Sequence, residues 1–278
     1  MQKTASVPID MVKAYQKNKP NRIIIHPYLG SYFYRFNTKI PHLNDKRVRK
    51  ALAMSINRQQ LTDRVTKGGE TPAFTFTPPD TFGYSARAAF EFNPKMARDL
   101  MREAGYPNGE GFPVTELLYN TSEGHRKIAV AIQQMWKKNL GINITLSNQD
   151  WKVYLDSVNN GSYAIARAGW IGDYVDPNTF LNMWVTDGGN NRTGWSDPYY
   201  DDLISQQAPV SLNKFDRYNI MAKAEAVLLE NMPIIPIYIY NSKSLVHPSV
   251  KGIEPNILNY VLYKNIRLDS TLIEKEVD

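Results

Sequence analysis

Apolar positions in the middle of the chain alternate between helical spacing and short strand-like runs. Helical spacing over residues 122–139 and 150–158 predicts two amphipathic helices. Apolar runs at 114–119, 142–146 and 163–170 predict the strands that flank them. This β-α-β-α-β order predicts an α/β fold with a mixed β-sheet and flanking helices.

Further elements are expected on both sides of this central unit. Strands are predicted at 22–26 and 31–37, separated by a turn, and a last core strand at 234–240. Residues 68–92 are rich in Gly, Pro, Thr and Phe, and they are expected to form an ordered, irregular loop. Further helices are predicted at 45–57, 59–65, 94–104, 178–184, 198–206 and 213–230. Shorter strand-like pieces are expected at 244–247 and 260–266.

Composition and charge narrow the class of protein. The 278 residues are 42% hydrophobic, which allows a sizeable core. Lys and Arg number 33 against 27 Asp and Glu, so the formal net charge is +6, but the charges are interspersed. The basic run at 46–50 alternates with apolar residues at core spacing, so it is interpreted as the solvated face of a helix. No nucleic-acid partner is therefore expected.

Neither a transmembrane segment nor a signal peptide is expected within this chain. The longest apolar stretch, residues 232–240, is too short to cross a bilayer and contains two prolines. The N-terminal sequence lacks the apolar segment of a secretory signal. The chain as it stands is expected to be soluble, which leaves open that it is a processed or shortened form of an exported protein.

The motifs of common catalytic and metal sites are missing. The chain has no cysteine, which excludes disulfides, thiolate metal sites and cysteine nucleophiles. It lacks the motifs of serine hydrolases, P-loop proteins, zinc proteases and Rossmann domains. Its four histidines are far apart, and Asp173, Asp176 and Asn178 do not follow the spacing of a calcium loop. We therefore expect no enzyme activity, no metal and no cofactor.

The segment 166–174 carries the strongest signal of a binding site. A predicted strand ends there at Gly169, where the backbone can come close to a ligand. Arg167 offers a fork of donors that suits a carboxylate, and Asp173 offers an anion that suits an ammonium group. A site with both charges suits a zwitterion such as a peptide. A buried Arg167–Asp173 ion pair explains the same residues equally well.

Sequence motifs in a fixed order along the chain carry a family resemblance. The first is NDKRVRKAL at residues 44–52, followed by INR at 56–58. The others are YNTS at 119–122, WKKNLGI at 136–142, DWK at 150–152, ARAGW at 166–170, DY at 173–174, the stretch 218–225 and PIIP at 233–236. Together they resemble the C-terminal half of bacterial extracytoplasmic solute-binding proteins of the oligopeptide and dipeptide transport family.

This resemblance implies one large lobe of a two-lobed periplasmic-binding-protein fold of type II. Residues 25–240 would form the C-terminal peptide-binding lobe. Residues 1–24 would be a stub of the missing N-terminal lobe and hinge, and residues 241–278 a return segment that belongs to the other lobe's sheet. The implied function is to capture short oligopeptides in the periplasm and to deliver them to the inner-membrane permease subunits of an ABC importer.

The resemblance also implies roles for single residues. Asp173 would bind the α-ammonium group of the peptide, and Arg167 and His125 would meet its carboxylate directly or through water. The strand that contains Gly169 would pair with the extended peptide backbone. The side-chain pockets would be lined by Trp151, Trp170 and Tyr240, with Asn120 and Tyr28 as further candidates.

Other functions stay open at this point. The same fold could carry a non-peptide ligand such as haem or a metal chelate, or it could carry a murein peptide. A peptide hydrolase is the alternative from another class. Ile171 and Val158 depart from residues found in relatives, which leaves peptide length and side-chain preference undetermined.

Overall fold

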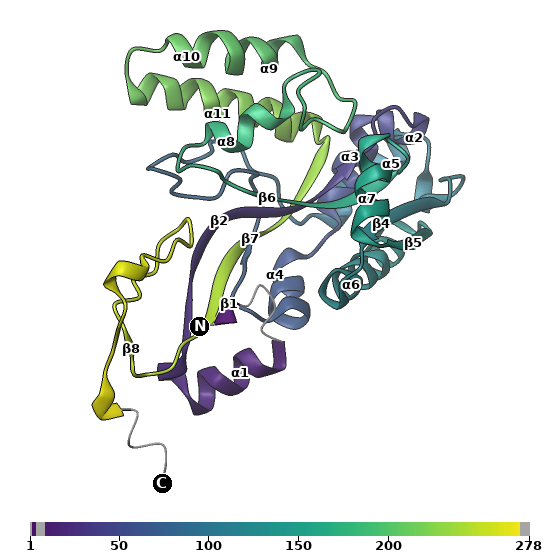
Figure 1. The fold of residues 1–278 in the computed structure, drawn as a ribbon. Coiled ribbons are helices and arrows are strands. Elements are labelled where there is room, and N and C mark those ends of the chain that lie inside the picture. Colours follow the sequence, from purple (N-terminus) through teal and green to yellow (C-terminus); the bar gives the residue numbers. More distant parts are fainter. Residues whose placement is uncertain (1, 4–8, 273–278) are drawn as a thin grey trace.

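The computed structural model describes residues 2–3 and 9–272, and one mixed seven-stranded sheet forms its centre (Figure 1). The strand order is β1–β7–β2–β6–β4–β5, and β3 pairs with β7 outside this path. The strands are β1 Gln2–Lys3, β2 Ile23–Phe36, β3 Thr71–Pro72, β4 Thr115–Asn120, β5 Ile144–Gln149, β6 Ile165–Ile171 and β7 Ile234–Leu245. The α/β fold with a mixed sheet is thus confirmed.

The parallel part of the sheet is the predicted β-α-β-α-β unit. β4 pairs in parallel with both β5 and β6. The helices between these strands are α6, Glu123–Leu140, and α7, Trp151–Asn159. α6 buries an apolar stripe that includes Ile128 and Trp136. It ends where Gly141 adopts a φ of 75°, a left-handed conformation that costs glycine little.

The antiparallel part of the sheet is dominated by β2 and β7, which pair from Ile23 opposite Leu245 to Arg35 opposite Ile234. The prediction of two short strands separated by a turn is wrong, because β2 is continuous through residues 27–30. Its register against β7 shifts at this point instead. Since β7 continues alongside, the extra residues form a bulge rather than a chain reversal, and proline is tolerated at a bulge.

The C-terminal segment also differs from the prediction. The piece at 244–247 largely continues β7, and the piece at 260–266 contains a short 3-10 helix, Tyr263–Asn265. The strands found beyond β7 are a two-residue pair, β8 Val250–Lys251 with β9 Arg267–Leu268. Several apolar side chains of this segment are exposed, so no buried face fixes an alternating strand pattern.

Helices cover both faces of the sheet (Figure 1) and form two hydrophobic cores. Tyr32 belongs to the core under α3, α5 and α6, and Phe33 belongs to the core under α8 to α11, as the alternation of a strand requires. The remaining helices are α1 Ile9–Asn18, α2 Pro41–Asn44, α3 Lys46–Met54, α4 Arg58–Leu61, α5 Pro94–Glu103, α8 Asn178–Leu181, α9 Pro198–Asp202, α10 Ala208–Val210 and α11 Lys214–Asn231. None of the helices in the described ranges is long and apolar enough to span a membrane.

A buried carboxylate on α11 holds the irregular loop at 68–92 in place. One oxygen of Glu225 accepts hydrogen bonds from the backbone N–H groups of Phe76 and Thr77, at 2.8 and 2.9 Å. The other oxygen accepts one from the Tyr84 hydroxyl at 2.7 Å. Burial raises the pKa of Glu225, and these donors oppose that rise by stabilising the carboxylate. The loop is ordered because its buried donors are satisfied from the helix.

Replacing this carboxylate tests the connection between helix and loop. We expect Glu225→Ala to lower the free energy of unfolding by about 3 kcal/mol, because it leaves buried donors without an acceptor. Urea denaturation of the two proteins measures the difference. Glu230→Ala, on the same helix, is the control. Its ion pairs with Lys46 and Lys50 are partly exposed, so it should cost about 1 kcal/mol or less. Equal losses in the two variants would contradict this account.

Candidate functional site

The candidate site lies at the end of β6, where this strand loses its second neighbour. β6 pairs with β2 along its whole length, but with β4 only through Ile165 and Ala166. From there to the end of β6, residues 167–171 pair with β2 on one side alone. No strand within the described residues pairs with their other side, so this part of β6 is an open edge.

The alternation of sheet hydrogen bonds decides which backbone groups this open edge presents. Just past β6, the N–H of Gly172 donates to the carbonyl of Leu29 on β2, at 2.8 Å. In an antiparallel pair every second residue bonds to the partner strand, so the even-numbered residues of β6 bond to β2. Gly169 and Ile171 therefore turn their N–H and C=O groups away from β2, toward the open edge.

Arg167 places a cation at the start of the open edge. Its guanidinium carbon lies 4.7 Å from the centre of the Tyr32 ring. Nη1 donates to Oδ1 of Asn120 at 3.2 Å, and Nη2 donates to the hydroxyl of Tyr240 at 3.0 Å. Burial opposes the charge, but the nearby Tyr240 and Tyr32 favour it, and the pKa of Arg167 lies above its usual value. The cation is held by uncharged groups, and its Nε makes no hydrogen bond within the described chain.

His125 reaches the same cluster from the first turn of α6. Its Nδ1 lies 3.3 Å from the hydroxyl of Tyr32, and the two rings are 5.6 Å apart. Burial lowers the pKa of His125 to about 3, and the charge of Arg167 acts in the same direction. At neutral pH His125 is therefore an uncharged hydrogen-bonding group, and not a second cation.

Asp173 lies beyond the other end of the open edge, and its side chain is exposed. Its backbone N–H donates to Oγ1 of Thr179 at 3.2 Å. The alternative of a buried Arg167–Asp173 ion pair is wrong, because no ion pair joins the two within the described residues and Arg167 uses its donors elsewhere. Asp176, by contrast, is paired with both terminal nitrogens of Arg217, at 2.7 and 2.8 Å. Asp173 thus keeps its charge accessible to a ligand.

Two hollows adjoin the open edge. The smaller, of about 190 Å³, is lined by Gly169, Trp170 and Trp151, among others. Trp151 is 57% exposed and stacks on Tyr154 with ring centres 5.7 Å apart. The larger, of about 410 Å³, is lined by Arg167, His125 and Tyr240, among others. We define these as the small hollow and the large hollow.

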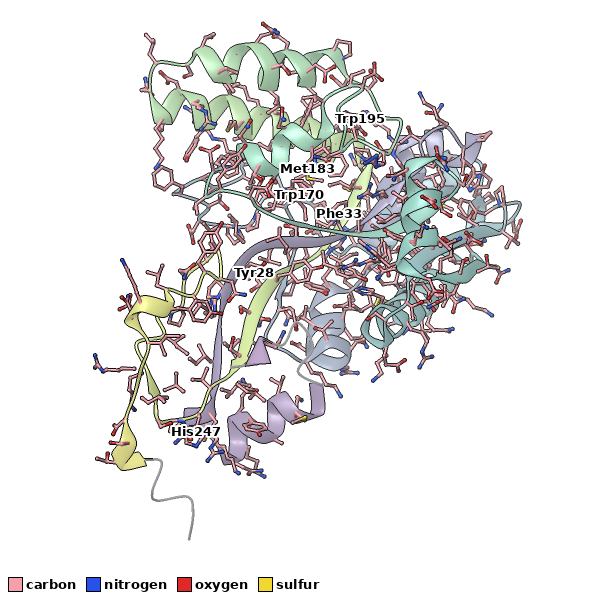
Figure 2. The ribbon with its side chains drawn as sticks, in the orientation of Figure 1. Tyr28, Phe33, Trp170, Met183, Trp195 and His247 are labelled. Atoms are coloured by element: carbon pink, nitrogen blue, oxygen red, sulfur yellow. The ribbon has the colours of Figure 1, made fainter. Side chains whose placement is uncertain are left out.

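The structure brings most of the predicted site residues to the open edge and the two hollows. Tyr28 lies half-buried on the bulge of β2 (Figure 2), close to Tyr260 and to the predicted site residue Tyr240. Tyr28, Asn120 and Asp173 line neither hollow. Tyr32 and Tyr154 were not predicted, although Tyr154 donates a short hydrogen bond to the carbonyl of Arg167. The alternating aromatic strand around Tyr32 is a signal that could have indicated it. No cluster of three or more histidine or acidic side chains that could bind a metal lies in the described parts of the chain.

Comparison with known proteins identifies the family to which this chain belongs. The profile of the bacterial extracellular solute-binding proteins, family 5 Middle, matches residues 2–192, which is more than half of the chain. The chain belongs to this family. The expected membership and the type II periplasmic-binding-protein fold are thereby confirmed.

Alignment with two curated relatives shows how much of their length this chain matches. The chain is 40% identical over 266 residues to the periplasmic murein peptide-binding protein MppA of Escherichia coli. It is 37% identical over 254 residues to the periplasmic oligopeptide-binding protein OppA of Salmonella typhimurium. These matches cover 94% and 89% of this chain, but 49% and 46% of the relatives. The chain therefore spans about half the length of the curated relatives it matches.

Solved structures of similar proteins also superpose on this chain over about half of their own length. The murein tripeptide binding protein MppA of Escherichia coli superposes with a TM-score of 0.87 at 38% identity. OppA of Haemophilus influenzae, in complex with RPPGFSPFR, superposes with a TM-score of 0.83 at 32% identity. Each superposition covers 95% of this chain and 53% of the other.

The contact between Gly169 and Tyr240 gives a direct test of how the open edge is built. A Cβ at position 169 would lie 2.6 Å from the Tyr240 hydroxyl. We expect Gly169→Ala to cost about 1–2 kcal/mol of stability, because it must displace the Tyr240–Arg167 hydrogen bond. In a Tyr240→Phe background the same change should cost at least about 0.5 kcal/mol less. A double-mutant cycle by chemical denaturation measures this coupling, and strictly additive costs would refute the contact.

Proposed function

We propose that this chain is the large ligand-binding lobe of a peptide receptor that supplies an ABC importer. The observation that carries the proposal is the open edge of β6. Gly169 and Ile171 present unused backbone N–H and C=O groups there, with Arg167 at one end and Asp173 at the other. An extended peptide presents the same backbone groups and can add to this edge as a further strand.

The ends of a peptide fit the charges at the two ends of the edge. An α-ammonium group is complementary to the exposed carboxylate of Asp173, and a carboxylate is complementary to the guanidinium of Arg167. His125, which is uncharged, can donate or accept a hydrogen bond beside that carboxylate. Backbone pairing together with terminal charges would bind many sequences, while the two hollows would accept alternate side chains.

The rest of the receptor is proposed from the half-length match to relatives. Residues 25–240 would form the lobe described here, and residues 1–24 and 241–278 would belong with the part of the protein that closes over the ligand. The relatives' names place them in the periplasm. We propose the same location for this protein, with inner-membrane permease subunits as the partners to which it delivers peptide. It would act by binding and release and not as an enzyme.

A murein peptide is the second candidate ligand. The supporting observation is the 40% identity to the murein peptide-binding protein MppA. Such a ligand would use the same open edge and the same terminal charges. Competition between a murein tripeptide and trialanine for the complete receptor would separate the two candidates.

Removing the charge of Asp173 tests the proposed contact with the α-ammonium group. Asp173→Asn keeps the shape but leaves the ligand's ammonium group unpaired, which typically costs about 2–5 kcal/mol in a closed site. We therefore expect affinity for peptides with a free amine to fall at least tenfold. N-acetylated peptides should already bind poorly, and the substitution should change their affinity much less. Calorimetry on a complete receptor that contains this chain measures the four combinations.

Asp156→Asn is the matched control for this cycle. Asp156 is exposed on α7 and lines neither hollow, so the same charge is removed nearby without touching the proposed contact. We expect its effect to be small and independent of acetylation. If Asp173→Asn weakened acetylated and free peptides alike, the assigned role of Asp173 would be wrong.

A further inference from the structure

The small hollow is lined by two arginines that have no acidic partner among the described residues. Arg35 on β2 and Arg192 in the loop after α8 line it together with Trp170 and Gly169 of β6. The lining includes no Asp or Glu. Neither arginine side chain forms an ion pair or a hydrogen bond with another side chain within the described residues. Arg167 also borders the hollow, but its guanidinium extends over Tyr32, which belongs to the opposite core.

Arg35 is the more unusual of the two. It is half-buried, but its Nε is fully buried without a hydrogen-bond partner in the described chain. Burial lowers the pKa of Arg35, Tyr163 and Tyr154 oppose that change, and the charges of Arg192 and Arg167 act in the same direction as burial. Its guanidinium carbon lies 5.6 Å from the centre of the Phe33 ring, but no anion balances its charge in the described chain. Arginine keeps its charge in such surroundings, and a buried charge without an anionic partner is costly. An anion in the hollow would supply the missing partner.

The large hollow differs from the small hollow because two of its cations already have an acidic partner. Of its cations, Lys243 lies 2.5 Å from the carboxylate of Glu70, and Lys127 lies 3.8 Å from that of Glu123. Its third cation is Arg167, which the proposed function assigns to the terminal carboxylate of the peptide. Any further ligand anion there would have to compete with Glu70 or Glu123, whereas Arg35 and Arg192 have no acidic partner in the described chain. The small hollow therefore keeps an unmet requirement for negative charge after the peptide's terminal carboxylate is bound.

We infer that the small hollow binds a carboxylate carried on a side chain of the peptide, so that the receptor favours peptides with Asp or Glu at that position. This inference rests on the proposed function. A peptide strand on the open edge would pass beside Gly169 and direct alternate side chains to opposite sides. The small hollow opens next to Gly169, and its volume of about 190 Å³ suits one side chain. Two guanidinium forks can hold one carboxylate through short, charge-assisted hydrogen bonds.

Nuclear magnetic resonance on a complete receptor that contains this chain can test the inference directly, because its closed site excludes water from the contacts. The probes are three tripeptides of alanine that carry one Glu at the first, second or third position, each compared with its Gln counterpart. The signals followed are the side-chain Nε–H groups of Arg35 and Arg192, and the backbone amides of Gly169 and Ile171. We expect one Glu peptide to shift the two arginine signals and to bind at least tenfold more tightly than its Gln counterpart.

Variants of the two arginines complete the test. Arg35→Gln and Arg192→Gln should each reduce the Glu-over-Gln preference to nearly one, while Arg267→Gln, which removes an exposed charge on β9, should preserve it. The melting temperature of Arg35→Gln should stay the same or rise, because a buried charge without a partner is removed. A fall of several degrees would show that Arg35 has a structural role, and it would count against the inference.

The outcomes separate this inference from the proposed function. If Glu and Gln peptides shift Gly169 and Ile171 equally and leave the arginine signals unchanged, the inference is wrong and peptide binding at the edge stands. If no peptide shifts any of the four signals at millimolar concentration, both are wrong. Only a preference for Glu that depends on Arg35 and Arg192 supports the inference.

Discussion

The pairing of β2 with β6 and β7 at once determines how the open edge and the Arg167 side chain are placed. β7 accompanies β2 across its bulge and keeps it continuous, and β6 pairs with the part of β2 from Gly30 to Phe36. Since side chains alternate along a strand, a slip of β6 by one residue would move the Arg167 side chain to the other face of the sheet. The same slip would turn the backbone groups of Gly169 toward β2. The open edge and its cation therefore depend on one register.

The charged groups at the two ends of the open edge, Arg167 and Asp173, form no ion pair within the described residues, so a ligand can pair with both. Arg167 is surrounded by tyrosines and an amide instead of an acid, and Asp173 stands exposed at the far end. While the site is open to water, a contact to such groups contributes about 0–1 kcal/mol. The same contacts become much stronger when a closed site excludes water. In the proposed receptor, closure by the remainder of the protein would turn weak contacts into selective ones.

The sequence predicted those features that depend on local pattern. The β-α-β-α-β unit followed from the hydrophobic period, and the segment 166–174 stood out because a strand ends there beside opposite charges. Features that depend on distant partners were not predictable. The bulge of β2 is decided by β7, the neutrality of His125 by its burial against Tyr32, and the unpaired state of Arg35 by the absence of an acid among its described neighbours. Spacing alone could not tell an Arg167–Asp173 pair from two separate charges.

The central claim is that a peptide binds by adding to the open edge of β6. Amide hydrogen exchange, resolved by residue and measured with and without a saturating peptide, tests it most directly. The account predicts that the Gly169 and Ile171 amides exchange rapidly in the free chain and become strongly protected with peptide. The Ala168 and Trp170 amides, which bond to β2, should be protected in both states. Peptide binding that leaves Gly169 and Ile171 unprotected would contradict the account.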